Sequence, residues 1–319
     1  MRPALLVFGH ALAVAWFLPA LLSRLTSSGI SARLGLAAWL TAMASVLASV
    51  VVALQYLAVA AIAGWSQLAE AVCRSVTGGR CTAVVYRSAA FEFALGVAAV
   101  AAALALALLA WRYGRSVQGA QQRTRAHAEA ARITGRRLAG AGAAVVLDAA
   151  RPAAYCVPGR PAAIVLTSGA LAVLDPRQLT AVLAHERAHL AGRHHVLIAL
   201  TRGLAATFPG VPLFTRGPAE VARLAEMCAD DAAARHSSRP TLITALLAMG
   251  TGAAVPAAAL AATTCAVAAR VQRLLEPARP ACHARNRLAL ITVMLLLALV
   301  PALVTRFAGP LTAHGLYGA

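Results

Sequence analysis

The stretch HERAHLAGRHH, residues 185–195, decides the fold, because it fits two different metal-binding patterns. As H-E-x-x-H, it supplies two ligands, His185 and His189, and needs a third from elsewhere in the chain. As H-E-x-x-H-x-x-G-x-x-H, with Gly192 and His195 in place, it supplies all three ligands itself. The two interpretations predict different folds, so the rest of the chain has to distinguish them.

The composition is that of a membrane protein. Of the 319 residues, 60% are hydrophobic and 13% are charged, whereas a soluble domain has about a quarter charged residues. Runs without any Asp, Glu, Lys or Arg cover residues 3–23, 34–69, 93–111 and 288–305. A membrane-spanning helix needs roughly 20 apolar residues. We therefore expect about four transmembrane helices. The first is expected to be an anchor, because no small-residue signal-peptide cleavage site follows it.

The basic residues argue against two classes of function. The net charge is +18 and all 29 basic residues are Arg, but only 5% of residues are aromatic and no groove-like basic–aromatic pattern occurs. Basic stretches commonly flank membranes, so we expect no direct nucleic-acid partner. The absence of Lys excludes a Walker A site and a Ser-x-x-Lys nucleophile in this chain.

The distribution of Arg predicts the orientation in a cell (inner or plasma) membrane. Residues 112–137 contain seven Arg against the single acid Glu129. Short Arg-rich flanks stay in the cytoplasm, so the region after the third helix is predicted to be cytosolic. The loop over residues 64–92 is then outside, where Cys73 and Cys81 are predicted to form a disulfide in an oxidising compartment.

We expect an α-helical membrane protein with an inserted α+β, zincin-like domain. Its predicted parts are three transmembrane helices with their outer loop (1–111), a cytosolic zinc domain (112–287), a fourth transmembrane helix (288–306) and a short outer tail (307–319). The zinc domain is predicted to open with an Arg-rich helix and three short apolar strands, near residues 114–138, 143–149, 153–157 and 162–168.

The motif lies in the last turns of a predicted helix. Asp175 suits the N-cap, Pro176 the first helical position, and Gln178 completes a capping box, while Gly192 suits the helix end. A second helix is predicted from Pro218 to Arg235. Two weakly charged stretches, 196–215 and 240–269, fit either buried core helices or a hairpin in or on the membrane.

The helical spacing of the motif predicts a catalytic zinc site with one ion. His185 and His189 are one turn apart on the same side of the helix, and neutral imidazole nitrogen suits zinc. Glu186 lies beside them near an apolar stripe, where a carboxylate is costly unless it is paired or close to a metal. In the H-E-x-x-H mechanism this carboxylate accepts a proton from the attacking water and passes it to the leaving amine.

Two residues compete for the third ligand position. The stretch RLAEMCADDAAAR places Glu226 and Asp230 one turn apart, so Glu226 can coordinate the metal while Asp230 orients a ligand histidine. The alternative for this pair is a solvated acidic face. His195 is the rival ligand, but no Met-turn signal accompanies it. We expect His194 and His195 to be solvated or to support the site at the helix end.

Five stretches in order resemble the catalytic core of integral-membrane gluzincins, which include the HtpX-type proteases and, closer, the BlaR/MecR-type antirepressor peptidases. They are AYCVPGR (154–160), IVLTSGAL (164–171), LTAVLAHERAHLAGRHH (179–195), EMCADDAA (226–233) and RVQRLLEP (270–277). The resemblance covers roughly residues 140–277. It implies that His185, His189 and Glu226 bind zinc and that Glu186 is the general base.

The resemblance also implies an activity and partners. Antirepressor peptidases are linked to cleavage of themselves or of a small DNA-binding repressor, so a peptide or a small winged-helix repressor is the expected substrate, with the bilayer as surroundings. An HtpX-like quality-control protease and a non-proteolytic, zinc-stabilised scaffold are the alternatives. Zincins pair extended substrate with an edge strand, for which IVLTS (164–168) is the candidate; an ordinary buried strand explains this run equally well.

Overall fold

The structure is a computed structural model that describes residues 2–77, 89–138, 144–157, 159, 162–251, 257–276 and 280–308. Over these ranges the chain is mainly helical with one small sheet. Cys81 and most of the predicted outer tail lie outside the described residues, so the predicted Cys73–Cys81 disulfide stays a prediction.

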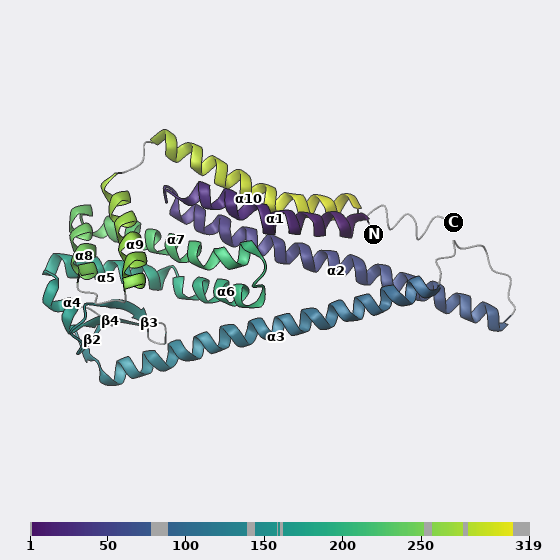
Figure 1. The fold of residues 1–319 in the computed structure, drawn as a ribbon, viewed down its shortest axis with the longest axis horizontal. Helices are drawn as coiled ribbons and strands as arrows, with labels where there is room; N and C mark the ends of the chain where they lie inside the picture. Colours follow the sequence, from purple (N-terminus) through teal and green to yellow (C-terminus); the bar gives the residue numbers. More distant parts are fainter. Residues whose placement is uncertain are drawn as a thin grey trace.

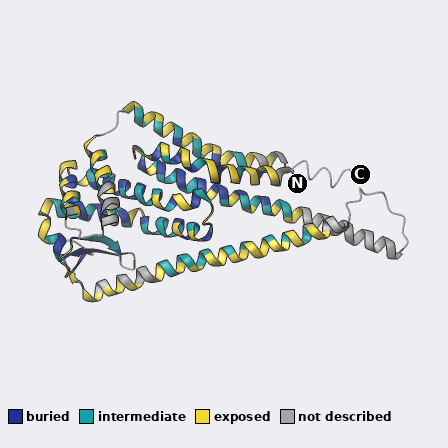
Figure 2. Ribbon diagram, in the orientation of Figure 1, coloured by how far each residue is buried: buried dark blue, intermediate teal, exposed yellow. Residues whose placement is uncertain are grey.

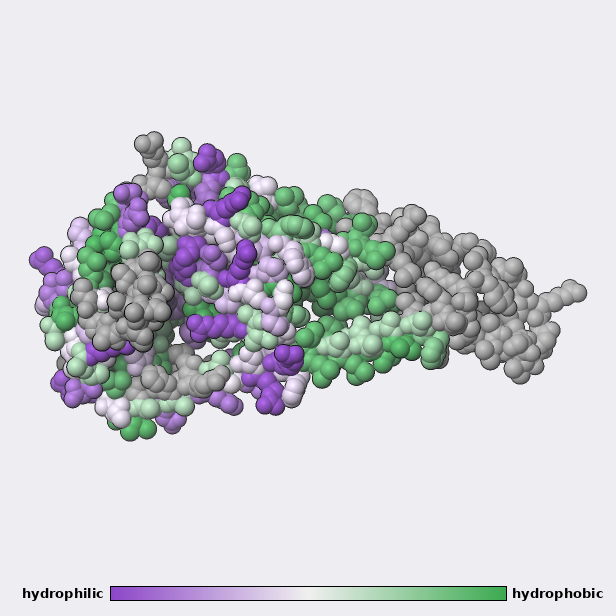
Figure 3. Space-filling view, in the orientation of Figure 1, coloured by the Kyte–Doolittle hydropathy of each residue, from purple (hydrophilic) through white to green (hydrophobic). Residues whose placement is uncertain are grey.

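Four long helices form the elongated part of the molecule, and the third along the chain meets the second at one end and diverges from it toward the sheet (Figure 1). They are α1 (Arg2–Thr26), α2 (Ala32–Thr77), α3 (Ala89–Thr134) and α10 (Pro280–Ala308). Each contains an apolar stretch long enough to cross a membrane, and Figure 3 shows apolar side chains gathered over this part. These stretches are Ala4–Thr26, Ala32–Val59, Gly96–Gln122 and Pro280–Leu303. Within the described residues, the prediction of about four candidate membrane helices is therefore confirmed in number and approximate position.

Helix α3 differs from the prediction in length. The Arg-rich segment predicted as a separate helix near 114–138 continues the third apolar helix without interruption to Thr134. Residues 112–134 contain no proline, and nothing else in this segment forces the backbone out of the helix. The apolar span and its basic extension are thus one element that reaches the sheet (Figure 1).

The sheet has four strands: β1 (Arg136–Arg137), β2 (Ala144–Leu147), β3 (Ala154–Val157) and β4 (Ala163–Thr167). Their spatial order is β1-β2-β4-β3, with β2 parallel and β3 antiparallel to β4. Of the two interpretations of IVLTS, the structure therefore favours the buried strand over the edge strand. This run forms β4, which is buried along its whole length between two neighbours, and β3 lies at the sheet edge instead.

The remaining helices surround the sheet and one end of the long bundle. They are α4 (Ser168–Val173), α5 (Pro176–Ala191), α6 (His194–Thr207), α7 (Pro212–His236), α8 (Arg239–Thr251) and α9 (Ala257–Leu275). The capping box at the start of α5 is confirmed, since the Asp175 carboxylate accepts from Gln178 N–H and the Gln178 side chain accepts from Asp175 N–H.

Helix α7 begins six residues before the predicted start at Pro218. Leu213 and Phe214 are buried in the same apolar cluster as Trp39 of α2. Their packing in this cluster stabilises an additional helical segment before Pro218. Pro212 takes the early helical position expected of Pro218, which instead lies inside the helix and removes one backbone hydrogen bond there.

Helices α6 and α7 form a hairpin that enters the space between α2 and α3 (Figure 1). Gly203 of α6 packs so closely on α3 that a Cβ there would lie 2.9 Å from the Tyr113 ring and from Val117. The burial pattern in Figure 2 follows this packing along α7. The stretch 196–215 thus comprises most of α6, a turn over 208–211 and the start of α7. Helix α6 packs on α3, and α7 packs on both α2 and the motif helix α5.

Candidate metal centre

The two motif histidines converge on one point because they lie one turn apart on α5. His185 Nε2 and His189 Nε2 are 3.1 Å apart, and both side chains are buried. The Nδ1 atoms of the two rings lie next to Asp230 and His194, respectively. This arrangement leaves the two Nε2 atoms together at the surface of a cavity.

Glu226 of α7 completes a three-residue cluster. Its carboxylate oxygens lie 3.4 Å from His185 Nε2 and 3.4 Å from His189 Nε2. Zinc–nitrogen bonds of roughly 2.05 Å in a tetrahedron place neighbouring ligand atoms about 3.3 Å apart. The Nε2–Nε2 distance of 3.1 Å is close to this spacing, as are the 3.4 Å distances from Glu226 Oε2 to His185 and from Glu226 Oε1 to His189. With one ligand atom taken from each residue, the three atoms lie within 4.8 Å of one another. The two imidazoles and one carboxylate fit a zinc ion in number, type and spacing.

The remaining ring nitrogens are held by two further residues. His185 Nδ1 lies 3.1 Å from an oxygen of Asp230, which is fully buried. His189 Nδ1 lies 2.9 Å from His194 Nδ1, and His194 is also buried. Such contacts fix the ring orientation and leave each Nε2 free to bind a metal. Of the two interpretations for His194, the structure thus favours a supporting role over a solvated one.

His195 does not join this cluster. The chain turns at Arg193, which has the left-handed φ of 49°, and His195, in the first turn of α6, is not among the residues whose ligand atoms come together. Gly192 ends α5 as its C-cap, as predicted, and a Cβ there would lie 2.4 Å from His194 Nε2. Glycine at this position therefore lets the His194 ring reach His189.

Arg270 of α9 is a part of the centre that the sequence interpretation did not assign. Its guanidinium donates to both Asp230 oxygens, at 2.6 and 2.8 Å, and lies 3.0 Å from a Glu226 oxygen. Arg270 is the first charged residue after the charge-free stretch 240–269, and this was the available signal. A single arginine thus pairs with two of the acidic residues of α7, Glu226 and Asp230.

The carboxylates make the site attractive to a cation. Burial opposes the shift, but hydrogen bonds from His185 and the Arg270 charge lower the pKa of Glu226 to about 2, and Arg270 and His185 do the same for Asp230. Burial would lower the pKa of His185, yet the two carboxylates raise it to about 9. Burial lowers the pKa of His189 to about 4, so this imidazole is neutral at pH 7, as a metal ligand must be.

Glu186 lies in the same cavity and has a different environment. Burial and the charge of Glu226 raise its pKa to about 7, partly offset by His185 and Arg270 and by the Cys156 backbone amide of β3. A carboxylate with a pKa near neutrality both accepts and donates protons efficiently. The side chain next to the metal cluster is therefore suited to acid–base chemistry.

The cavity in front of these groups has a volume of about 330 Å³. Strand β3 forms one wall through Ala154, Tyr155 and Cys156. Helix α8 forms an apolar wall through Leu242, Leu246 and Met249. The sheet edge, the metal cluster and the apolar wall thus surround one space.

One comparison with known proteins gave a match. The sequence model of the family described as Peptidase family M48 matches residues 117–211, a range that includes α5 and ends before Glu226 and Arg270. No curated protein and no solved structure matches the chain. The match supports a metallopeptidase. Glu226, which the structure brings beside the two histidines, lies beyond the matched residues.

Proposed function

We propose that this protein is a membrane-anchored zinc endopeptidase in which His185, His189 and Glu226 hold the metal and Glu186 is the general base. The observation that carries the proposal is the convergence of two imidazoles and a carboxylate, with one ligand atom of each within 4.8 Å of the others, beside the buried Glu186. The family match to residues 117–211 supports the reaction class independently of this geometry.

Zinc bound there would supply a Lewis acid that lowers the pKa of a water molecule and polarises the peptide carbonyl. Glu186 accepts the proton of the attacking water, because its carboxylate is aimed into the same cavity and has a pKa near neutrality. It then donates this proton to the leaving amine, which completes hydrolysis without a covalent intermediate. Asp230, His194 and Arg270 hold the ligands in place and take no part in proton transfer.

The substrate is proposed to be an extended peptide that pairs with β3. Strand β3 has β4 on one side, and no described strand pairs with its other edge. A peptide added to this edge would run past Glu186, and its side chains would alternate between solvent and cavity. The apolar α8 wall would then favour an apolar residue next to the cleaved bond.

For the biological role we favour regulatory cleavage of a cytosolic repressor or of the protein itself. Two features support this choice. The sequence motifs resemble those of the antirepressor peptidases, and this chain has the same order of three apolar helices, a zinc domain and a fourth apolar helix. The Arg-rich extension of α3 supports a cytoplasmic site. A neighbouring gene for a winged-helix repressor would favour this role, and envelope-stress induction without such a gene would favour an HtpX-like one.

The test of the activity uses the full chain in detergent. Parent protein and Glu186→Gln are incubated with a library of unstructured peptides, and zinc per protein is measured in the same samples. Both should contain one zinc, while hydrolysis should fall by at least about 10²–10⁴-fold in the variant. Equal hydrolysis by both proteins would overturn the assignment of Glu186, and no hydrolysis by zinc-loaded parent would favour the scaffold alternative.

A further inference from the structure

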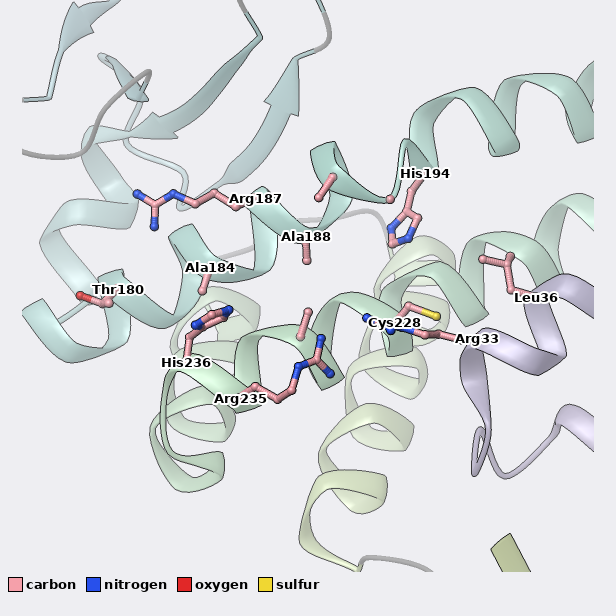
Figure 4. Close-up of a pocket in the computed structure, with 13 residues that line it drawn as sticks. Arg33, Leu36, Thr180, Ala184, Arg187, Ala188, His194, Cys228, Arg235 and His236 are labelled. Atoms are coloured by element: carbon pink, nitrogen blue, oxygen red, sulfur yellow. The ribbon is translucent and has the colours of Figure 1, made fainter. Parts of the chain in front are cut away.

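A second cavity lies on the face of α5 opposite the metal centre. Its volume is about 660 Å³, within the roughly 300–1,000 Å³ of ligand pockets. The α5 residues that line it include Thr180, Ala184 and Ala188, whereas His185, Glu186 and His189 line the metal-site cavity. Helix α7 and the first turns of α2 form the other walls, as Figure 4 shows.

The lining of this cavity is strongly basic. Three arginines from three different helices contribute to it, Arg33 of α2, Arg187 of α5 and Arg235 of α7, together with two imidazoles. None of its lining residues is acidic. Figure 4 shows Arg33 beside Cys228 and His194, with Arg235 and His236 further along α7.

The acidic residues of α7 form ion pairs with arginines that do not line this cavity. Glu220 pairs with Arg223, while Glu226 and Asp230 both bind Arg270. Asp231 pairs with Arg273 of α9. Across the part of the chain that the structure describes, no carboxylate forms an ion pair with any of the three cavity arginines. Like charges in one cavity repel, so a bound anion would stabilise this arrangement.

The position of the cavity suggests where such an anion comes from. Arg33 is the second residue of α2, whose apolar stretch begins at Ala32, and Leu36 lines the cavity one turn further on. The α1 stretch ends at Thr26, on the same side of the bundle. The end of a membrane-spanning stretch is the level at which lipid headgroups lie.

We propose that this cavity binds a phosphate group, held by Arg33 and Arg235 with Arg187 at the rim. Planar guanidinium groups match the geometry of phosphate oxygens and bind them through paired hydrogen bonds. Two sources carry this chemistry, the headgroup of an anionic phospholipid and free inorganic phosphate. The cavity is separate from the peptide site, so this inference does not depend on the proposed peptidase activity.

The test measures binding of short-chain fluorescent phosphatidylglycerol to the full chain in an uncharged detergent. The cavity variant is Arg33→Gln/Arg235→Gln. Its matched control is Arg202→Gln/Arg216→Gln, which removes the same charge from exposed positions that do not line this cavity. We expect the cavity variant to bind about tenfold more weakly for each guanidinium removed, and the control to bind like the parent.

Competition identifies the source. Displacement of the label by unlabelled phosphatidylglycerol but not by inorganic phosphate assigns the site to a lipid, and displacement by both assigns it to phosphate in general. Equal affinity of cavity variant and control, or equal binding of phosphatidylcholine and phosphatidylglycerol by the parent, would overturn the proposal. Ala232→Leu, which narrows the cavity without changing charge, should also weaken binding, and it replaces the double variant if that variant fails to fold.

Discussion

Replacement of Arg270 by Leu should destabilise the protein far more than replacement of its neighbour Arg273. Asp230 has no exposed surface and receives two hydrogen bonds from Arg270, at 2.6 and 2.8 Å. Opposite charges about 4 Å apart attract by roughly 4 kcal/mol at an effective dielectric constant near 20. Removing one partner of a buried pair typically costs about 3–5 kcal/mol, because the other charge stays buried without compensation.

Arg273 provides a matched control on the same helix. It pairs with Asp231, whose side chain is 39% exposed, so water replaces the lost partner. Such partly exposed pairs contribute about 1 kcal/mol or less. Leucine keeps part of the arginine stem packing in both variants. Arg273 also donates to the Gly29 carbonyl, so its replacement removes one hydrogen bond besides the exposed ion pair.

The assay is thermal unfolding of zinc-free protein in detergent at a fixed scan rate. We expect Arg270→Leu to lower the apparent Tm by on the order of 10 °C and Arg273→Leu by a few degrees. Adding Asp230→Ala to Arg270→Leu should recover part of the loss, because the uncompensated charge is then gone. Equal effects of the two arginine variants, or no recovery in the double variant, would refute this account of the acidic pair.

The remaining predictions concern the metal, the substrate and the topology. Chelation of the metal should abolish hydrolysis and lower the apparent Tm, and added zinc should restore the hydrolysis and the original Tm. A Tm that does not change on chelation would argue against a site that couples metal binding to stability. Leu246→Trp should fill the peptide cavity and reduce kcat/KM for peptides with Leu or Phe by about tenfold or more while sparing those with Ala; an equal loss for all would contradict the α8 wall as a specificity pocket. A Ser238→Cys variant should react with an impermeant thiol reagent only after cells are permeabilised, and labelling of intact cells at this exposed position would place the metal centre outside. Cys156 and Cys228 are unsuitable reporters, because burial raises the pKa of both thiols to about 11.

Short sequence patterns predicted those helices and caps that are determined by residues close together in the chain. The capping box of Asp175 and Gln178, the helix that carries the motif and the four apolar helices all follow from patterns within a few turns of chain. The juxtaposition of Glu226 and Asp230 with α5 was also expected, from the rarity of acids in this region and their one-turn spacing.

Features that depend on contacts between residues far apart in the sequence could not be predicted from such local patterns. An apolar run such as β4 is compatible with an edge or a central strand, and only the pairing with both β2 and β3 decides between them. The start of α7 depends on Leu213 and Phe214 finding an apolar cluster on α2. Arg270 lies 40 residues from Asp230, in a segment whose surroundings gave no indication of a partner.

Zinc content of single variants tests the metal centre most directly. Glu226→Ala leaves two protein ligands, so this variant should be largely zinc-free at ordinary metal levels. Asp230→Ala should lose about 10–100-fold in zinc affinity, because His185 loses the carboxylate at its Nδ1. His195→Ala should contain as much zinc as the parent, since its side chain is not part of the cluster. The opposite order, with His195→Ala emptied and Glu226→Ala still loaded, would contradict the ligand set and the proposed enzyme class together.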